Sequence, residues 1–215
     1  MELPNNFTTF YIVRHGETLA NAAKIIAGHF DSPLNGRGEE QAGARGQNLK
    51  HISFDVIFSS DLARAKRTAE LIKLERELAV NTKEILRERN FGIYEGKQIE
   101  KFYEENKVIL EKLKTLSEKE KLSLKFYESY ESNDEISARM LTFIREAAVT
   151  YPGKTILVVS HGSIMRAFLT HLGVASYDQL PAGHIDNLGY FVLKTDGIDF
   201  FVSETNGIHI KNKPI

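Results

Sequence analysis

Three short apolar runs, each followed by the spacing of a helix, most constrain the fold of this chain. They are FTTFYIV at 7–13, DVIFSSD at 55–61 and KTILVVSHG at 154–162. Each run is continuous in its apolar character and rich in β-branched residues, which is typical of strands buried on both faces. Strands that alternate with helices form a mainly parallel sheet. The sequence therefore predicts an α/β fold with a mainly parallel central sheet flanked by helices on both faces.

The remaining periodic segments complete this arrangement. Helical spacing covers residues 36–50, 61–75, 135–151 and 162–172. The segment LGYFVLKTDGIDFFVSETNG at 188–207 indicates two strands joined at Asp196-Gly197, a dipeptide typical of hairpin turns. We expect this C-terminal hairpin to form one edge of the sheet.

One segment, at about 97–134, differs in composition from the rest of the chain. It is rich in lysine and glutamate, and Leu110, Leu113 and Leu116 recur within it at helical spacing. This pattern favours a solvated pair of helices with an apolar underside. The same helices would suit a lid over an active site, and the two interpretations are compatible. With 215 residues, the chain is expected to be one domain that carries this helical insertion.

Arginine and histidine side chains lie at or just after the ends of the predicted strands. The first strand ends in RHG at 14–16 and the third ends in SHG at 160–162, while Arg64 lies in the helix after the second strand. In an open α/β sheet, ligands bind beyond the carboxyl ends of the strands. Two histidines and two arginines at this edge would suit a phosphate, because guanidinium matches phosphate oxygens in charge and geometry. A helix beginning near Gly162 would add backbone N–H donors.

Composition narrows the chemistry of this edge. The chain has no cysteine, which excludes thiolate catalysis, disulfides and cysteine-ligated zinc. Its formal net charge of −1 provides no overall attraction to nucleic acid or a membrane surface, and we expect neither partner. A metal site at His15 and His161 would need a third ligand such as Glu88, and Arg14 and Arg64 would repel the cation. We therefore expect neither a metal nor another cofactor.

The first ten residues, MELPNNFTTF, contain no basic region followed by a long apolar stretch. No window of the sequence approaches the length of a transmembrane helix. We expect no signal peptide and a cytoplasmic location. None of these features indicates the oligomeric state, and a homodimer is one of the alternatives.

Several sequence blocks between residue 10 and about residue 195 carry a resemblance to a known family. They are RHGETLAN at 14–21, GHFDSPLNGRG at 28–38, SSDLARAKRTAE at 59–70, LRERNFGIYEG at 86–96, ESNDEISAR at 131–139, VVSHGSIMRAFL at 158–169 and IDNLGYFVL at 185–193. In content and in order they resemble the histidine phosphatase superfamily, the phosphoglycerate-mutase-like fold. RHG alone would be a weak signal, but the ordered set is highly specific.

The resemblance implies phosphoryl transfer through a phosphohistidine. His15 would be the nucleophile, while Arg14, Arg64 and His161 would stabilise the charge on the phosphoryl oxygens. Glu88 would protonate the leaving alkoxide and then deprotonate the attacking water. That role requires a protonated Glu88, although arginines flank it in the sequence. The residues implied to bind the phosphate or substrate are Arg14, Asn21, Gly28, Arg64, Gly162 and Asn187.

Departures from the mutase pattern favour hydrolysis. Cofactor-dependent mutases hold phosphoglycerate with a lysine beyond the block that contains Glu88 and with an arginine pair. Here Ile99 occupies the lysine position, and the insertion contains no Arg-Arg dipeptide. The mutases also carry tryptophans near the first loop, whereas this chain has none.

We therefore expect a phosphomonoesterase that acts on a small phosphorylated metabolite. The alternatives are a cofactor-dependent phosphoglycerate mutase, a protein phosphatase of the same superfamily, and a non-catalytic module that binds a phosphorylated ligand or a protein.

Overall fold

The computed structural model describes residues 7–212. The expectation of no signal peptide rested on residues 1–10, and most of these lie outside the described residues. The strands are β1 (Thr8–Arg14), β2 (Val56–Ser60), β3 (Val80–Lys83), β4 (Thr155–Ser160), β5 (Ile185–Thr195) and β6 (Phe200–Ile208). The helices are α1 (Leu19–Ala22), α2 (Gly36–Asn48), α3 (Ala63–Lys73), α4 (Ile99–Glu105), α5 (Lys107–Leu113), α6 (Glu118–Ser123), α7 (Asn133–Thr150) and α8 (Gly162–His171), with 3₁₀ turns η1 (Glu84–Leu86) and η2 (Gly92–Tyr94).

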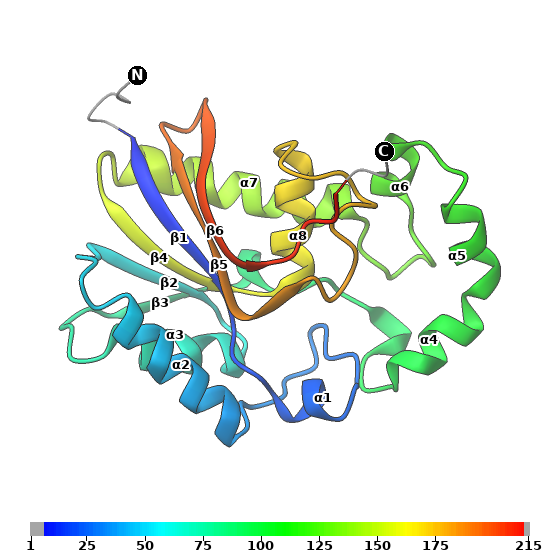
Figure 1. Ribbon diagram of the computed structural model, residues 1–215, viewed down its shortest axis with the longest axis horizontal. Helices are drawn as coiled ribbons and strands as arrows, with labels where there is room; N and C mark the ends of the chain where they lie inside the picture. The colour runs from blue at the N-terminus through cyan, green and yellow to red at the C-terminus, as the bar shows by residue number, and fades with distance from the viewer. Residues whose placement is uncertain (1–6, 213–215) are drawn as a thin grey trace.

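The strands form one 6-stranded sheet in the order β3-β2-β4-β1-β5-β6 (Figure 1). Strands β3, β2, β4 and β1 pair in parallel, while β5 pairs antiparallel with both β1 and β6. The hairpin of β5 and β6 forms the edge of the sheet next to β1. Both the mainly parallel α/β fold and the C-terminal hairpin edge are therefore confirmed.

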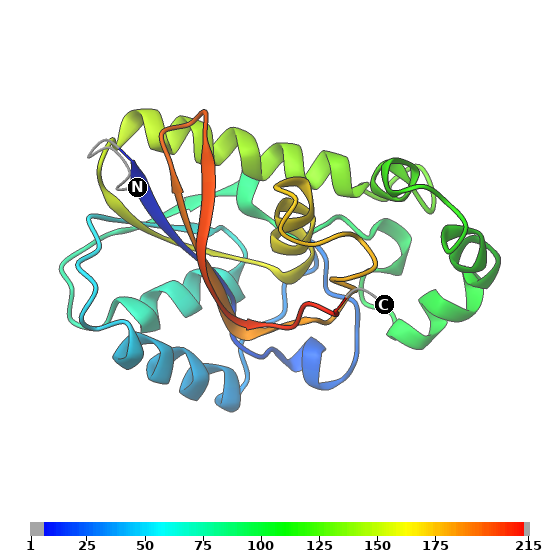
Figure 2. The same ribbon diagram turned by 45° about the horizontal axis from the view of Figure 1, so that its top comes forward.

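Helices cover both faces of the sheet (Figure 2). Helices α2 and α3 lie against one face, and α7 and α8 lie against the other. Successive residues of β1 point to opposite faces. Phe10 and Ile12 therefore join the core beneath α7 and α8, whereas Val13 joins the core beneath α2 and α3. A strand with a core on each face needs apolar residues at consecutive positions, which explains its unbroken apolar sequence.

The edge strand β3 was not expected from the sequence. Its residues, Val80–Lys83, are mostly polar, and the last three are exposed. It pairs only with β2, and it therefore lacks the apolar pattern by which buried strands are found. The four expected helices are all present, and their ends differ from the expected ones by two residues or fewer.

The segment at about 97–134 is helical, as expected, but it forms three short helices where a pair was expected. Its helices α4, α5 and α6 form an arm that extends past the carboxyl ends of the parallel strands (Figure 1). Phe102, Tyr94 and Tyr130 form a small aromatic core at its base. Within residues 7–212, none of the helices combines the length and the apolar character needed to cross a bilayer.

Candidate active site

The pairing of β1 with β4 brings His15 and His161 together. The last registered pair of these neighbouring parallel strands is Arg14 with Ser160, so each histidine is the next residue of its strand. The backbone N–H of His15 donates to Ser160 O at 3.0 Å, which continues the ladder by one bond. The two ring centroids lie 5.0 Å apart. Both side chains are buried, with His15 4% exposed and His161 0% exposed.

The glycine after each histidine permits a close approach. A Cβ at Gly16 would lie 2.6 Å from the carbonyl oxygen of Gly38, so only glycine fits there without a backbone shift. At Gly162 a Cβ would lie 3.3 Å from Nε of Arg14, which is a tight contact. These glycines let the chain turn sharply beyond the strand ends while the imidazoles stay at the rim.

Backbone carbonyls orient the two buried guanidinium groups. Arg64 donates from Nη1 to Phe30 O at 3.0 Å and from Nη2 to Gly28 O at 2.6 Å. Arg14 donates from Nη1 to Ile185 O. Each arginine is therefore held through its terminal nitrogens, and its Nε is left for another partner.

Four buried polar groups at this edge have no hydrogen-bond partner within residues 7–212. They are Nε of Arg14, Nε of Arg64, and Nδ1 and Nε2 of His161. Buried polar groups are nearly always paired, and a buried charge without a partner is costly. Guanidinium N–H groups and an imidazole N–H all donate, so an oxyanion is the kind of partner they could take.

Hydrogen bonding defines the tautomer of His15. Its Nδ1 lies 2.7 Å from the carbonyl oxygen of Gly16. Because a carbonyl oxygen only accepts, Nδ1 must carry the ring proton when the imidazole is neutral. The lone pair then resides on Nε2, which is the nitrogen free to attack an electrophile.

Both histidines are held in the neutral form. Burial lowers the pKa of His15 well below the usual 6.5, and the charges of Arg64 and Arg14 lower it further. The pKa of His161 is lowered well below 6.5 by burial first and then by Arg64 and its other neighbours. Burial also lowers the pKa of Arg14 and of Arg64, but guanidinium remains charged at physiological pH.

We expect folding stability to fall steeply as the pH drops below neutrality. The pKa of each buried histidine is lowered in the folded protein, so below pH 6.5 the unfolded chain binds more protons. The contribution of the neutral histidines is therefore present above pH 6.5 and is lost as the pH falls toward their lowered pKa values. The loss is up to about 1.4 kcal/mol per pH unit for each histidine.

Urea unfolding between about pH 7.5 and about pH 5.5, in a phosphate-free buffer, measures this slope. In the His161→Gln variant one titrating group is removed, so the average slope over this range should fall by about 0.7 kcal/mol per pH unit, because a histidine in the unfolded chain is only half protonated at pH 6.5. Identical slopes in the variant and the wild-type protein would contradict a buried neutral His161.

Glu88 lies in the loop after η1, and its carboxylate contacts the first turn of α8. Its carboxylate accepts from the backbone N–H groups of Ser163 at 3.1 Å, Ile164 at 3.3 Å and Arg89 at 2.8 Å. The arginines on either side point elsewhere, because Arg87 forms a two-bond ion pair with Asp61 and Arg89 donates to the loop before α7. The carboxylate thus lies at the rim without an arginine paired to it.

A cavity of about 720 Å³ opens from this edge toward the helical arm. The expected site residues that line it are Arg14, His15, Asn21, Gly28, Arg64 and Glu88. A smaller cavity of about 100 Å³ beside it is lined by Gly162 together with Arg14 and Glu88. His161 does not line either cavity, since it lies behind His15 and is fully buried.

Asn187 contacts the backbone and does not line the large cavity. Its Nδ2 donates to His15 O at 3.0 Å and lies 3.5 Å from Oδ1 of Asn21. This geometry suits a residue that positions His15, whereas the sequence led us to expect a substrate-binding role. Asn21 itself lines the cavity, and its Oδ1 also accepts from the N–H of Thr18 at 3.2 Å.

Two residues that shape the site lie within the quoted sequence blocks but were assigned no role from the sequence. Thr68 accepts from Gly16 N–H at 3.1 Å and donates to Arg64 O at 2.7 Å, so it ties the loop after β1 to α3. Glu95 accepts from the N–H groups of His29 and Phe30, and it thereby orients the carbonyls that hold Arg64. Except for the bond from Thr68 to Arg64 O, these contacts join positions tens of residues apart, so the sequence blocks do not indicate them.

No group of three or more histidine, aspartate or glutamate side chains within residues 7–212 is arranged to hold a metal ion. The fold is of the α/β class, and two histidines and two arginines lie close together at the carboxyl edge of its sheet. The family model described as "Histidine phosphatase superfamily (branch 1)" matches residues 10–207. The chain belongs to this superfamily, as its sequence blocks led us to expect, and it is an enzyme of the phosphatase or mutase type.

Relatives include proteins of both types. The chain is 33% identical to the uncharacterized phosphatase PhoE of Bacillus subtilis over 168 residues, which cover 77% of each chain. It is 34% identical to the probable phosphoglycerate mutase GpmB of Salmonella choleraesuis over 168 residues, covering 78% of this chain and 76% of that one. The crystal structure of a phosphoglycerate mutase from Bacillus anthracis superposes with a TM-score of 0.81 at 30% identity and covers 94% of both chains.

Proposed function

We propose that this protein is a phosphomonoesterase that hydrolyses its substrate through a phosphohistidine formed on His15. The observation that carries the proposal is the pair of buried imidazoles, 5.0 Å apart, beside two guanidinium groups whose Nε atoms have no partner within residues 7–212. Such donors suit the equatorial oxygens of a phosphoryl group, where charge accumulates in the transition state. Membership of the superfamily supports a phosphorylated substrate.

In the first step, the lone pair on Nε2 of His15 attacks phosphorus. The N–P bond forms as the bond between phosphorus and the leaving oxygen breaks. Glu88, which lines the cavity, transfers its proton to that oxygen, so the product leaves as a neutral alcohol. Arg14 and Arg64, which line the cavity, stabilise the charge on the three remaining oxygens. His161, expected from the sequence to share this role, is fully buried and does not line the cavity.

In the second step, water attacks the phosphohistidine. Glu88 is now a carboxylate, and it takes a proton from the water as the new O–P bond forms. The N–P bond breaks, and its electron pair returns to Nε2 of His15. The products are inorganic phosphate and the starting enzyme, with Glu88 protonated for another cycle.

The surroundings of Ile99 support hydrolysis over a mutase reaction. Ile99 lines the large cavity at the position where mutases have a lysine. The lysines on either side have other partners, since Lys97 lies 5.2 Å from the ring centroid of Tyr94 and Lys101 pairs with Glu105 at 3.7 Å. A phosphoglycerate carboxylate would thus lack its expected cation here.

The experiment that tests the proposal follows the fate of the phosphoryl group. We expect the protein to release inorganic phosphate from 4-nitrophenyl phosphate. With 3-phosphoglycerate and 2,3-bisphosphoglycerate together, we expect no 2-phosphoglycerate, because water and not a second hydroxyl accepts the phosphoryl group. Formation of 2-phosphoglycerate faster than release of inorganic phosphate would instead identify a mutase, which is the alternative that the GpmB relative favours.

A further inference from the structure

The wall of the large cavity beyond the histidines is predominantly apolar. It includes Ile25, Ile99, Phe102, Leu110, Leu113 and Phe126. Most of these residues belong to the helical arm, and they lie on the side of the cavity away from the phosphate site. The volume of about 720 Å³ lies within the range of pockets that enclose drug-sized ligands, about 300–1,000 Å³. A leaving group much larger than a three-carbon acid therefore has room.

No side chain of helix α5 is fully buried, and two of its leucines line the cavity. Leu110 and Leu113 lie one turn apart, are half-buried, and belong to none of the hydrophobic clusters found within residues 7–212. On the same helix, Val108 is 84% exposed and does not line the cavity. Apolar area left uncovered on a cavity wall favours an apolar ligand.

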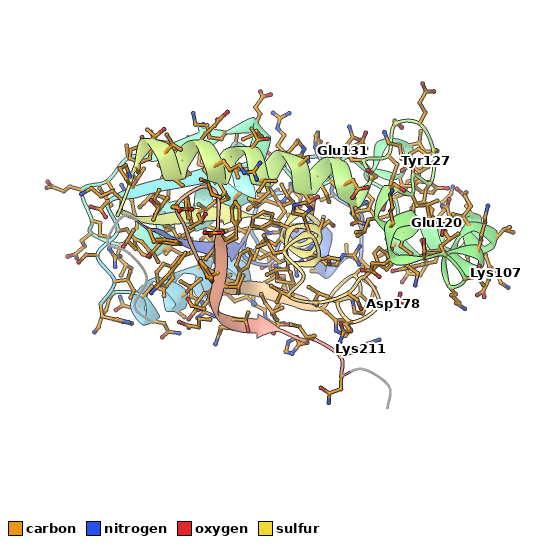
Figure 3. The ribbon with its side chains drawn as sticks, turned by 90° about the horizontal axis from the view of Figure 1, so that it is seen from above. Lys107, Glu120, Tyr127, Glu131, Asp178 and Lys211 are labelled. Carbon is orange, nitrogen blue, oxygen red and sulfur yellow. The ribbon has the colours of Figure 1, made fainter. Side chains whose placement is uncertain are left out.

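The arm is fixed to the rest of the protein at both ends, so the wall is already formed. At one end, Ile99 N–H donates to Lys24 O at 2.9 Å. At the other, Lys121 pairs with Asp178 at 2.5 Å, and Tyr177 N–H donates to Glu118 at 2.6 Å. Figure 3 shows Asp178 on the loop that faces the arm. A wall held in this way needs little ordering when a ligand binds.

The two arginines of this wall outside the phosphate site are already engaged in hydrogen bonds, and its lysine is largely exposed. Besides Arg14 and Arg64, the described basic residues that line the cavity are Lys24, Arg89 and Arg166. Lys24 lies 3.9 Å from Glu100 and is largely exposed. Arg89 donates to Glu131 O at 2.7 Å and to Oδ1 of Asn133 at 2.5 Å.

Arg166 is engaged in a similar way. It donates to Leu180 O at 3.2 Å and to Oδ1 of Asn133 at 3.3 Å, and its guanidinium lies 4.7 Å from the ring centroid of Tyr177. A carboxylate or a second phosphate on the leaving group would have to displace one of these contacts to pair with Arg89 or Arg166. An uncharged leaving group avoids that cost.

We propose that the substrate is a phosphate monoester of an apolar alcohol or phenol, whose hydrocarbon part lies against Leu110 and Leu113 of α5. This inference rests on the proposed function and specifies its substrate class. The phosphate occupies the site of His15, Arg14 and Arg64, and the hydrocarbon part extends toward the arm. Each methylene group buried against the wall is removed from water, which favours binding of the longer ester.

The test is a series of straight-chain esters, from ethyl phosphate through butyl and hexyl to octyl phosphate, each below its micelle concentration. We expect kcat/KM to rise roughly two- to fourfold for each added methylene. The leaving-group chemistry is nearly constant along the series, so the trend reports apolar contact. Octyl phosphate should also be preferred to 3-phosphoglycerate.

Two variants locate the contact. In Leu110→Asn/Leu113→Asn, the ratio of kcat/KM for octyl phosphate to that for ethyl phosphate should fall about tenfold or more, because polar groups replace the apolar wall. The control, Val108→Asn, makes the same kind of change on the same helix outside the cavity, and it should leave this ratio unchanged. Circular dichroism checks that α5 remains helical in both variants.

The outcomes separate this inference from the proposed function. A flat chain-length series, a preference for 3-phosphoglycerate, or an equal fall in the ratio for both variants would overturn the apolar substrate class. The phosphomonoesterase assignment would survive each of these results, because the esters would still release inorganic phosphate. If no ester in the series and no aryl phosphate is hydrolysed, both proposals fail.

Discussion

Replacing His15 with alanine is expected to lower kcat/KM for 4-nitrophenyl phosphate by roughly 10⁴-fold or more, since loss of a nucleophile removes the covalent route. Nε2 of His15 carries the lone pair, because Nδ1 donates to Gly16 O at 2.7 Å. His161, behind it, is fully buried and does not line the cavity, so it cannot take over the attack. Release of inorganic phosphate measures the effect.

Two further observations make this result specific to the nucleophile. His15→Asn retains a polar side chain at the strand end and should be equally inactive, whereas His51→Ala removes an exposed histidine and should retain wild-type turnover. A rapid quench should trap protein-bound phosphate that is stable in base and labile in acid, in the wild-type protein only. Turnover in His15→Ala close to that of wild type would exclude the phosphohistidine mechanism.

The second large effect concerns Glu88 and depends on the leaving group. In Glu88→Gln, kcat/KM for an alkyl phosphate should fall by about 10²–10⁴-fold, because an alkoxide needs a proton as it leaves. For 2,4-dinitrophenyl phosphate the fall should be about tenfold or less, because that phenolate leaves without one. The parameter kcat/KM is the right measure, since it reports the step that forms the phosphohistidine.

Glutamine retains the size of Glu88, but it cannot accept with both terminal atoms from the N–H groups of Ser163 and Ile164. A melting curve therefore accompanies the kinetics. Glu40→Gln, an exposed change on α2, is the matched control and should affect neither ester. An equal loss for the alkyl and the dinitrophenyl ester would show that Glu88 positions groups at the rim and does not donate a proton.

The arrangement of the site favours binding of a phosphoryl group at the expense of the stability of the folded protein. Nε of Arg14 and of Arg64 and both ring nitrogens of His161 are buried without a hydrogen-bond partner within residues 7–212, which costs free energy in the folded protein. These groups belong to residues at the carboxyl ends of β1 and β4 and in α3. A bound phosphoryl group would satisfy them together, and the donors would need no reorganisation during the reaction.

Much of the fold could be predicted from the sequence, because the residue pattern that specifies a strand or helix lies within that element. The runs that became β1, β2 and β4 are apolar at consecutive positions, as strands covered on both faces must be. The edge strand β3 was missed because its polar residues resemble a loop, and its place depends on pairing with β2. Leu110 and Leu113 were recognised as an apolar stripe, but their contact with the cavity depends on how the arm folds back over the site.

The sequence by itself determined the α/β class and the family, and it identified His15, Arg64 and His161 as a set. This was possible because each strand end and each motif consists of contiguous residues. Tertiary structure alone decided that Nδ1 of His15 bonds Gly16 O, that Asn187 supports His15 and lies outside the large cavity, and that α5 faces the phosphate site. The physical reason is that hydrogen bonds, burial and electrostatic shifts depend on distances in space, which a linear pattern does not contain.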